Sequence, residues 1–290
     1  MRRALLLTAV LALIPANARA ADPGRWHQVN QTTLPLYYYQ GITADPARNL
    51  YFDGIWFGLY RTDSAFAETG RNDDAIPPDV HAREHYDHIG DLTYDGAEGG
   101  RLLLPLECYY PVPGTDGNPC KQGAIGVADP VTLDWRYYVH LDPAEIPKAM
   151  WAEVSPNGKL IWTSSGDDLL AYRTRDVSPA NAAPDHAPIR AVRRLANAVP
   201  PSGITGAAFV GQRLFVAGQD GDLFQVWSID LETGARRLEI ERTIVGESEG
   251  LASADVAGGM LHWLIQPYNE HALPTYGPAN ATLLSFAPGA

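Results

Sequence analysis

Acidic and polar side chains recur at equivalent places in short apolar segments that are repeated along this chain. The acids are Asp91, Glu153 and Glu249, and the polar residues beside them are Gln40 and Thr205. These segments contain no lysine or arginine. Carboxylates that converge without a basic partner repel one another, unless they hold a cation, share protons or face solvent. A hard cation such as Ca²⁺ prefers oxygen ligands, so the pattern predicts a divalent-metal site formed by these five residues.

A second dense group of chemical side chains precedes one of these segments. The letters of His81, Glu84 and His85 match the H-x-x-E-H zinc motif, and His88 follows closely. The motif binds zinc only on a helix, and the stretch before His88 leaves room for a short one in a chain that otherwise indicates strands. We therefore disfavour a zinc site. We expect a loop over the metal in which His85 or His88 acts as a general base.

Five similar segments must position these residues. They begin near Gly41, Gly90, Ala152, Thr205 and Gly250, with spacings of 49, 62, 53 and 45 residues. Aromatic and β-branched runs bounded by turn residues fill each repeat, which is the pattern of strands. The period is that of a four-stranded propeller blade. The sequence thus predicts an all-β fold, a five-bladed β-propeller, with the first strand of each blade lining a central channel.

The last repeat offers one strand too few for a complete blade. A strand around Trp26 to Asn30, near the mature N-terminus, can supply it. Joining both chain ends in one blade closes the ring and removes two sheet edges. A β-sandwich with a small second domain is the alternative, but the regular recurrence and the absence of a linker argue against it.

The N-terminus has the composition of a secretory signal. Arg2 and Arg3 precede an apolar run, and Ala18 and Ala20 suit a signal peptidase. We expect residues 1–20 to be removed, residues 21–290 to form a single domain, and the protein to be secreted or periplasmic. The remaining chain has 19 basic against 34 acidic residues, which disfavours nucleic acid and anionic membranes as partners. We expect a monomer.

The two cysteines, Cys108 and Cys120, flank a loop rich in proline and glycine. In an oxidising compartment the default for such a pair is a disulfide bond. In the chain-entropy model, closing a loop of this size stabilises the fold by roughly 3 kcal/mol.

The repeat run, especially His88–Asp95 and Glu247–Leu251, resembles secreted β-propellers of the gluconolactonase-like, phytase-like and olfactomedin-like groups at superfamily level. This resemblance implies a calcium ion in the channel and, for several members, metal-dependent hydrolysis of lactones or phosphoesters. Only Asp91, Glu153 and Glu249 lie at comparable acid positions. The asparagines of the gluconolactonase group and the basic cluster of a phytase have no counterparts.

These observations predict a metal-dependent hydrolase of a small ester, lactone or phosphoester, with a Lewis-acidic ion that polarises the scissile group. The alternative is a non-catalytic extracellular scaffold with a structural calcium ion, whose loops bind a glycan or another ligand. Aromatic residues near the predicted strand ends could line a pocket for a small molecule or a sugar in either case.

Overall fold

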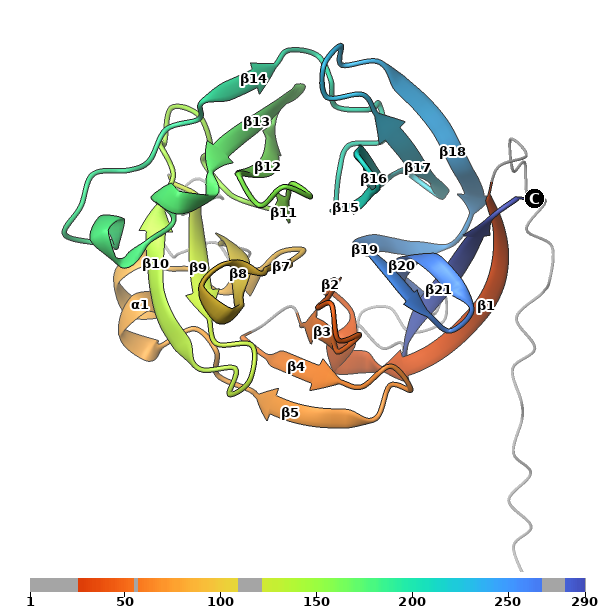
Figure 1. The fold of residues 1–290 in the computed structure, drawn as a ribbon, viewed down its shortest axis with the longest axis horizontal. Coiled ribbons are helices and arrows are strands. Elements are labelled where there is room, and N and C mark those ends of the chain that lie inside the picture. The colour runs from red at the N-terminus through yellow and green to blue at the C-terminus, as the bar shows by residue number, and fades with distance from the viewer. Residues whose placement is uncertain (1–25, 55–56, 109–121, 268–279, 290) are drawn as a thin grey trace, which may run out of the picture.

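The computed structural model describes residues 26–54, 57–108, 122–267 and 280–289. Within these residues the chain forms five antiparallel sheets that stand around a central channel (Figure 1). The five-bladed β-propeller predicted from the repeats is therefore confirmed. The predicted signal segment, residues 1–20, lies outside the described residues, and secretion stays a prediction.

Blades 1 to 4 take their strands in chain order from the channel outward. Blade 1 contains β2 (Gly41–Ala44), β3 (Leu50–Asp53), β4 (Leu59–Thr62) and β5 (Glu68–Asn72). In blade 2 the inner strand is split into β6 (His88–Ile89) and β7 (Thr93–Asp95), which both pair with β8 (Arg101–Glu107). The outer strands of blade 2 are β9 (Ala124–Ala128) and β10 (Trp135–His140). The break between β6 and β7 contains Asp91, which instead forms a parallel bridge with Trp151 of the next blade.

Blades 3 and 4 follow the same plan. Blade 3 contains β11 (Glu153–Val154), β12 (Leu160–Ser165), β13 (Asp168–Arg173) and β14 (Arg193–Leu195). Blade 4 contains β15 (Gly206–Val210), β16 (Arg213–Asp220), β17 (Leu223–Ile229) and β18 (Arg236–Thr243). The outer strand of blade 3 is short because Pro179 to Pro188 form an irregular connection before it.

Blade 5 joins the two ends of the chain, as expected. Its inner strands are β19 (Gly246–Val256), β20 (Gly259–Pro267) and β21 (Asn280–Pro288). The outer strand is β1 (Trp26–Pro35), which pairs antiparallel with β21 from Trp26 opposite Pro288 to Pro35 opposite Asn280. The N-terminal strand is longer than predicted and replaces the missing fourth strand of the last repeat.

The hydrophobic core is divided among the blade interfaces. The described residues form five buried clusters, and each joins the facing sides of two neighbouring blades. Phe52 of blade 1 and Leu264 of blade 5 belong to one such cluster, and Trp162 of blade 3 and Val216 of blade 4 belong to another. Because each blade is apolar on both faces, the ring buries its sheets against one another and leaves the channel to polar side chains.

Helical structure in the described residues is limited to short segments. They are α1 (Pro78–Glu84) and the 3₁₀ turns η1 (Leu36–Tyr38), η2 (Ala97–Gly99), η3 (Thr174–Asp176) and η4 (Pro179–Asn181). Among these residues, no helix has the length and apolar character needed to cross a membrane.

Candidate active site

Asp91 lies in the channel wall and is fully buried. Its carboxylate accepts backbone N–H groups from three other blades: Ile42 at 3.0 Å, Ala207 at 2.8 Å and Leu251 at 3.3 Å. A Cβ atom on Gly250 would lie 2.5 Å from Asp91 Oδ1, so the close approach requires glycine there. Asp91 thus fastens the inner strands β2, β15 and β19 to blade 2, a structural role that uses both of its oxygens.

Glu153 lies further along the channel than Asp91. Its carboxylate accepts the Thr93 hydroxyl at 2.6 Å and the Phe209 backbone N–H at 3.1 Å, both two residues beyond the level of Asp91. Burial raises the pKa of Glu153 to about 7, and these two hydrogen bonds oppose the rise. The predicted alignment placed Asp91 and Glu153 on one level, but the parallel bridge between Asp91 and Trp151 offsets them.

Glu249 lies at the opposite end of the channel from Glu153, which we call the upper end because the inner strands β2, β6 and β15 begin there. Gln40 Nε2 donates to Glu249 Oε2 at 3.0 Å, and the Thr205 hydroxyl lies 3.0 Å from the Glu249 backbone carbonyl oxygen. Burial is the largest cause that raises the pKa of the Glu249 carboxyl well above its ordinary value. The negative charges of Glu247 and Asp53 add to this rise. Gln40 and Thr205 therefore both contact Glu249, Gln40 through the side chain and Thr205 through the backbone.

Asp53 is a channel acid that the sequence interpretation missed. It ends β3 opposite Gly41 and is fully buried, and neither carboxylate oxygen has a hydrogen-bond partner within the described chain. A Cβ atom on Gly41 would lie 2.7 Å from Asp53 Oδ2, so this glycine makes room for the carboxylate. Burial, and then the charge of Asp91, raises the pKa of Asp53 well above its ordinary value. The sequence signal that could have revealed Asp53 is an aspartate at the end of the otherwise apolar strand Leu-Tyr-Phe-Asp.

His88 lies at the upper end beside a buried glutamate that was also missed. Its Nε2 lies 3.7 Å from Glu107 Oε1, and Lys148 Nζ pairs with Glu107 Oε2 at 3.0 Å. Burial and the nearby Lys148 charge lower the pKa of His88 to about 4, so its imidazole is neutral at pH 7. Burial raises the pKa of Glu107, and Lys148 opposes that rise. The charge of Glu107 is also among the smaller causes that raise the pKa of Glu249.

His85 does not approach the channel. Figure 1 shows α1 on the outer rim beside β10, and His85 is the exposed residue that ends this helix in a left-handed conformation with φ of 66°. The short helix forms where the H-x-x-E-H letters occur, but its side chains are engaged elsewhere. His81 Nδ1 bonds the Tyr86 carbonyl oxygen at 2.8 Å.

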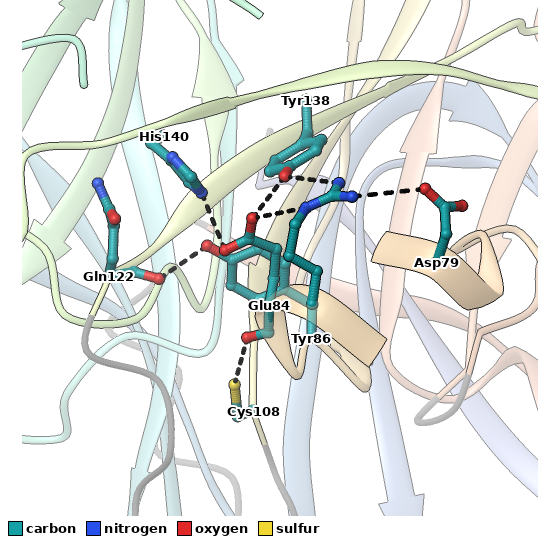
Figure 2. A network of polar contacts seen from close by, with 8 residues as sticks. Asp79, Glu84, Tyr86, Cys108, Gln122, Tyr138 and His140 are labelled. Atoms are coloured by element: carbon teal, nitrogen blue, oxygen red, sulfur yellow. Dashed lines mark hydrogen bonds and ion pairs between the residues drawn. The ribbon is translucent and has the colours of Figure 1, made fainter. Parts of the chain in front are cut away.

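Glu84 anchors a polar network between α1 and β10 (Figure 2). It accepts the Tyr138 hydroxyl at 2.6 Å and lies 3.2 Å from His140 Nε2. Arg83 also donates to the Tyr138 hydroxyl, at 3.0 Å. These bonds attach the helix to the outside of blade 2, so the network is structural and the zinc motif has no metal-binding geometry.

The five predicted metal ligands do not form one coordination shell. The carboxylate oxygens of Asp91 and Glu153 accept hydrogen bonds from N–H and hydroxyl groups at different levels of the channel. Thr205 contacts the backbone of Glu249. In the described part of the chain, no group of three His, Cys, Asp or Glu residues is arranged to hold a metal ion. The predicted Ca²⁺ ion therefore lacks a fitting set of ligands here, and we assign no chemical step to it.

The predicted disulfide concerns one residue that the structure describes. Cys108 is buried directly after β8, with its Sγ 3.9 Å from the Glu84 carbonyl oxygen. Cys120 lies outside the described residues, so the Cys108–Cys120 bond stays a prediction.

Fold and site together define a five-bladed β-propeller with a column of coupled carboxylates in its channel. The column runs from Glu107 and Glu249 through Asp53 and Asp91 to Glu153, and the charges of its members influence one another.

Solved structures share this fold at low sequence identity. Glutaminyl cyclase from Myxococcus xanthus matches with a TM-score of 0.52 at 10% identity, over 91% of this chain and 97% of that one. A GH43 protein of Bacillus licheniformis matches with a TM-score of 0.54 at 10% identity, over 89% of this chain and 54% of that one. These likenesses concern the propeller fold alone, and the three groups named from the repeat pattern stay a prediction. No family model and no curated protein sequence matches the chain.

Proposed function

We propose that this protein is a propeller hydrolase that cleaves a small, uncharged ester or lactone at the upper end of its channel. The proposal rests on two buried groups at this end of the channel, Glu249 bonded by Gln40 and His88 beside Glu107. Burial raises the pKa of Glu249 well above its ordinary value, which favours its protonated form, and lowers the pKa of His88 to about 4, which keeps the imidazole neutral at pH 7. Titratable neighbours whose environments push their pKa values apart are the usual source of a general acid and a general base.

The reaction follows from these protonation states. The neutral His88 imidazole takes a proton from a water molecule as the water oxygen bonds to the acyl carbon. Glu249 donates its proton to the departing alkoxide oxygen as the ester C–O bond breaks, which yields a carboxylic acid and an alcohol. The proton on His88 then returns to Glu249. Glu107, at 3.7 Å from His88, stabilises the transient imidazolium.

Access and charge set the substrate class. His88 and Glu249 are buried, but Gln40 and Lys148 beside them are partly exposed, so a small substrate approaches past these two side chains. Without residues 1–20 the chain has 19 basic against 34 acidic residues, and this net negative charge disfavours a phosphoester. Glutaminyl cyclase and a GH43 protein share the fold, which supports a propeller of this kind as an enzyme scaffold.

The test is a turnover assay of the purified protein on p-nitrophenyl acetate, p-nitrophenyl butyrate, γ- and δ-lactones, and p-nitrophenyl phosphate. We expect turnover of an ester or lactone, with kcat reduced by roughly 10²–10⁴ in Glu249→Gln and in His88→Asn. The exposed residues Glu232 and His27 provide the controls Glu232→Gln and His27→Asn, which should keep full activity. Full activity in both channel variants would refute the assignment, and a folded protein that turns over none of the substrates would favour the binding scaffold.

A further inference from the structure

A basic groove runs along blade 3 and its borders with blades 2 and 4. Of the 22 basic residues in this acidic chain, seven lie between positions 159 and 213. They are Lys159, Arg173, Arg175, Arg190, Arg193, Arg194 and Arg213. All seven belong to blade 3 or to the adjoining strand β16, so the chain concentrates positive charge at one place on its rim.

Three hollows make up this groove, and each shares residues with the next. One of about 560 Å³ is lined by Lys159, Arg173 and Arg175 together with the apolar Leu160 and Val192. It shares Leu160 with a hollow of about 540 Å³ between blades 3 and 4. It shares Val192 with a third hollow of about 380 Å³ on the side of blade 2.

Of the four acids that line the groove, Glu232 is exposed, and the other three accept hydrogen bonds from the protein itself. Glu145 accepts the Tyr172 hydroxyl at 3.0 Å and the Ala191 N–H at 2.8 Å. Asp168 accepts the Asn197 N–H at 2.9 Å and pairs with Arg194. Asp230 accepts two backbone N–H groups of its own turn, each at 3.0 Å. Six basic residues line the three hollows against four acids, so the groove keeps a net positive charge.

Several of the cations remain available to a partner. The side chains of Arg173 and Arg175 are 50% and 80% exposed, and both reach Asp176 only at 3.8 Å. Within the described chain no ion pair is formed by Lys159, which is exposed in the turn before β12. Arg193 lies over the Trp162 ring at 5.5 Å, which holds its guanidinium on an aromatic face.

The backbone beside these cations is also open. β14 is the last strand of its sheet in the described residues and spans only Arg193–Leu195. Val192, next to it, is 41% exposed. An outermost strand can accept an extended peptide as an additional strand, while side-chain pockets beside it select the sequence.

We infer that the blade 3 groove binds an extended acidic peptide segment of another protein, one that alternates carboxylate and apolar side chains. The guanidinium and ammonium groups would pair with the carboxylates, and Leu160 and Val192 would cover the apolar side chains. The mixture of apolar and basic lining favours a peptide over an acidic polysaccharide, whose surface is polar throughout. This inference does not depend on the proposed hydrolase activity.

The test uses a fluorescein-labelled peptide of alternating Glu and Val, with a Lys and Val peptide for comparison. We expect binding of the acidic peptide, weakened by added salt, and loss of affinity on the order of tenfold in Lys159→Gln/Arg175→Gln. The control Arg48→Gln/Arg136→Gln removes two basic residues from blades 1 and 2, where each is paired with an aspartate. It should bind like the wild type.

Equal loss of affinity in both double variants, or absence of binding, would overturn the inference. Tighter binding of an oligogalacturonate that depends on Lys159 and Arg175 would reassign the groove to acidic polysaccharides. If the protein sediments as a dimer and Lys159→Gln/Arg175→Gln abolishes this dimer, the groove would be reassigned to a second copy of this chain.

Discussion

The substitution Asp91→Asn tests whether the central aspartate is the ionised fastener of the inner strands. Asparagine has the same shape, but one of its two ends is an amide nitrogen that cannot accept a hydrogen bond. The N–H of Ile42 bonds Oδ1, and those of Ala207 and Leu251 bond Oδ2. Whichever way the amide is turned, at least one buried N–H faces another N–H.

Leaving one buried donor unsatisfied costs about 1–3 kcal/mol, and losing the charge weakens the remaining hydrogen bonds, so we expect a loss of about 2–4 kcal/mol. For a chain of this size, that corresponds to a drop in Tm on the order of 10 °C. The measurement is thermal unfolding by circular dichroism at pH 7. Asp63→Asn is the control, since Asp63 also accepts two backbone N–H groups, of Ala65 and Ala67, but in an exposed turn where water can replace it.

The variant Asp53→Asn completes this experiment. If Asp53 is the protonated member of the pair, asparagine imitates its neutral state and the Tm at pH 7 should stay within a few degrees of the wild type. The reasoning is refuted if Asp91→Asn unfolds at the same temperature as the wild type, or if Asp53→Asn is the more destabilised of the two.

Three further predictions concern the same channel. The pKa of Glu153 is raised to about 7, so its neutral form stabilises the fold at low pH, and this contribution is lost as the pH rises through 7. The free energy of unfolding in urea should therefore fall less between pH 5 and pH 8 for Glu153→Gln than for the wild type. Elemental analysis should find no stoichiometric metal, and EDTA should leave the Tm unchanged, because protons and N–H donors neutralise the column; a bound ion whose removal lowers the Tm would contradict this. Gly250→Ala should destabilise the protein by several kcal/mol, since its Cβ would meet Asp91 Oδ1 at 2.5 Å. The control Gly211→Ala lies at an open turn and should lose only the smaller stability that a positive φ costs an alanine.

The blade count and the closure of the ring could be predicted from the sequence, for a physical reason. Every blade must bury both of its faces, so each repeat carries the same alternation of apolar runs and turns, and the period is visible in the chain. The missing strand of the last repeat identified Trp26 to Asn30 as its replacement, and the structure pairs that segment with β21.

The arrangement of the site was harder to predict because it depends on offsets of one or two residues. Alignment on the repeats placed Asp91 and Glu153 together, but blade 2 is interrupted at Asp91, which pairs with Trp151 instead of with its own sheet. Asp53 and Glu107 lie on the second strands of their blades, where a search confined to first strands does not find them. His88 is buried at the start of β6, whereas His85 ends a short helix that lies on the rim and not over the channel.

The same offsets explain how crowded acids can exist in the channel without a metal. Carboxylates at one level of the channel would repel one another and need a cation. Carboxylates that are spread along the channel axis instead meet different hydrogen-bond donors. Burial raises the pKa of both Asp91 and Asp53, but three backbone N–H groups oppose the rise at Asp91, whereas the charge of Asp91 adds to the rise at Asp53. Burial is the largest cause of the raised pKa of Glu249, and the charges of Glu247, Asp53 and Asp91 add to it. Burial therefore favours the protonated form of Glu249 at the end of the channel where His88 is neutral, while Asp91 fastens the inner strands.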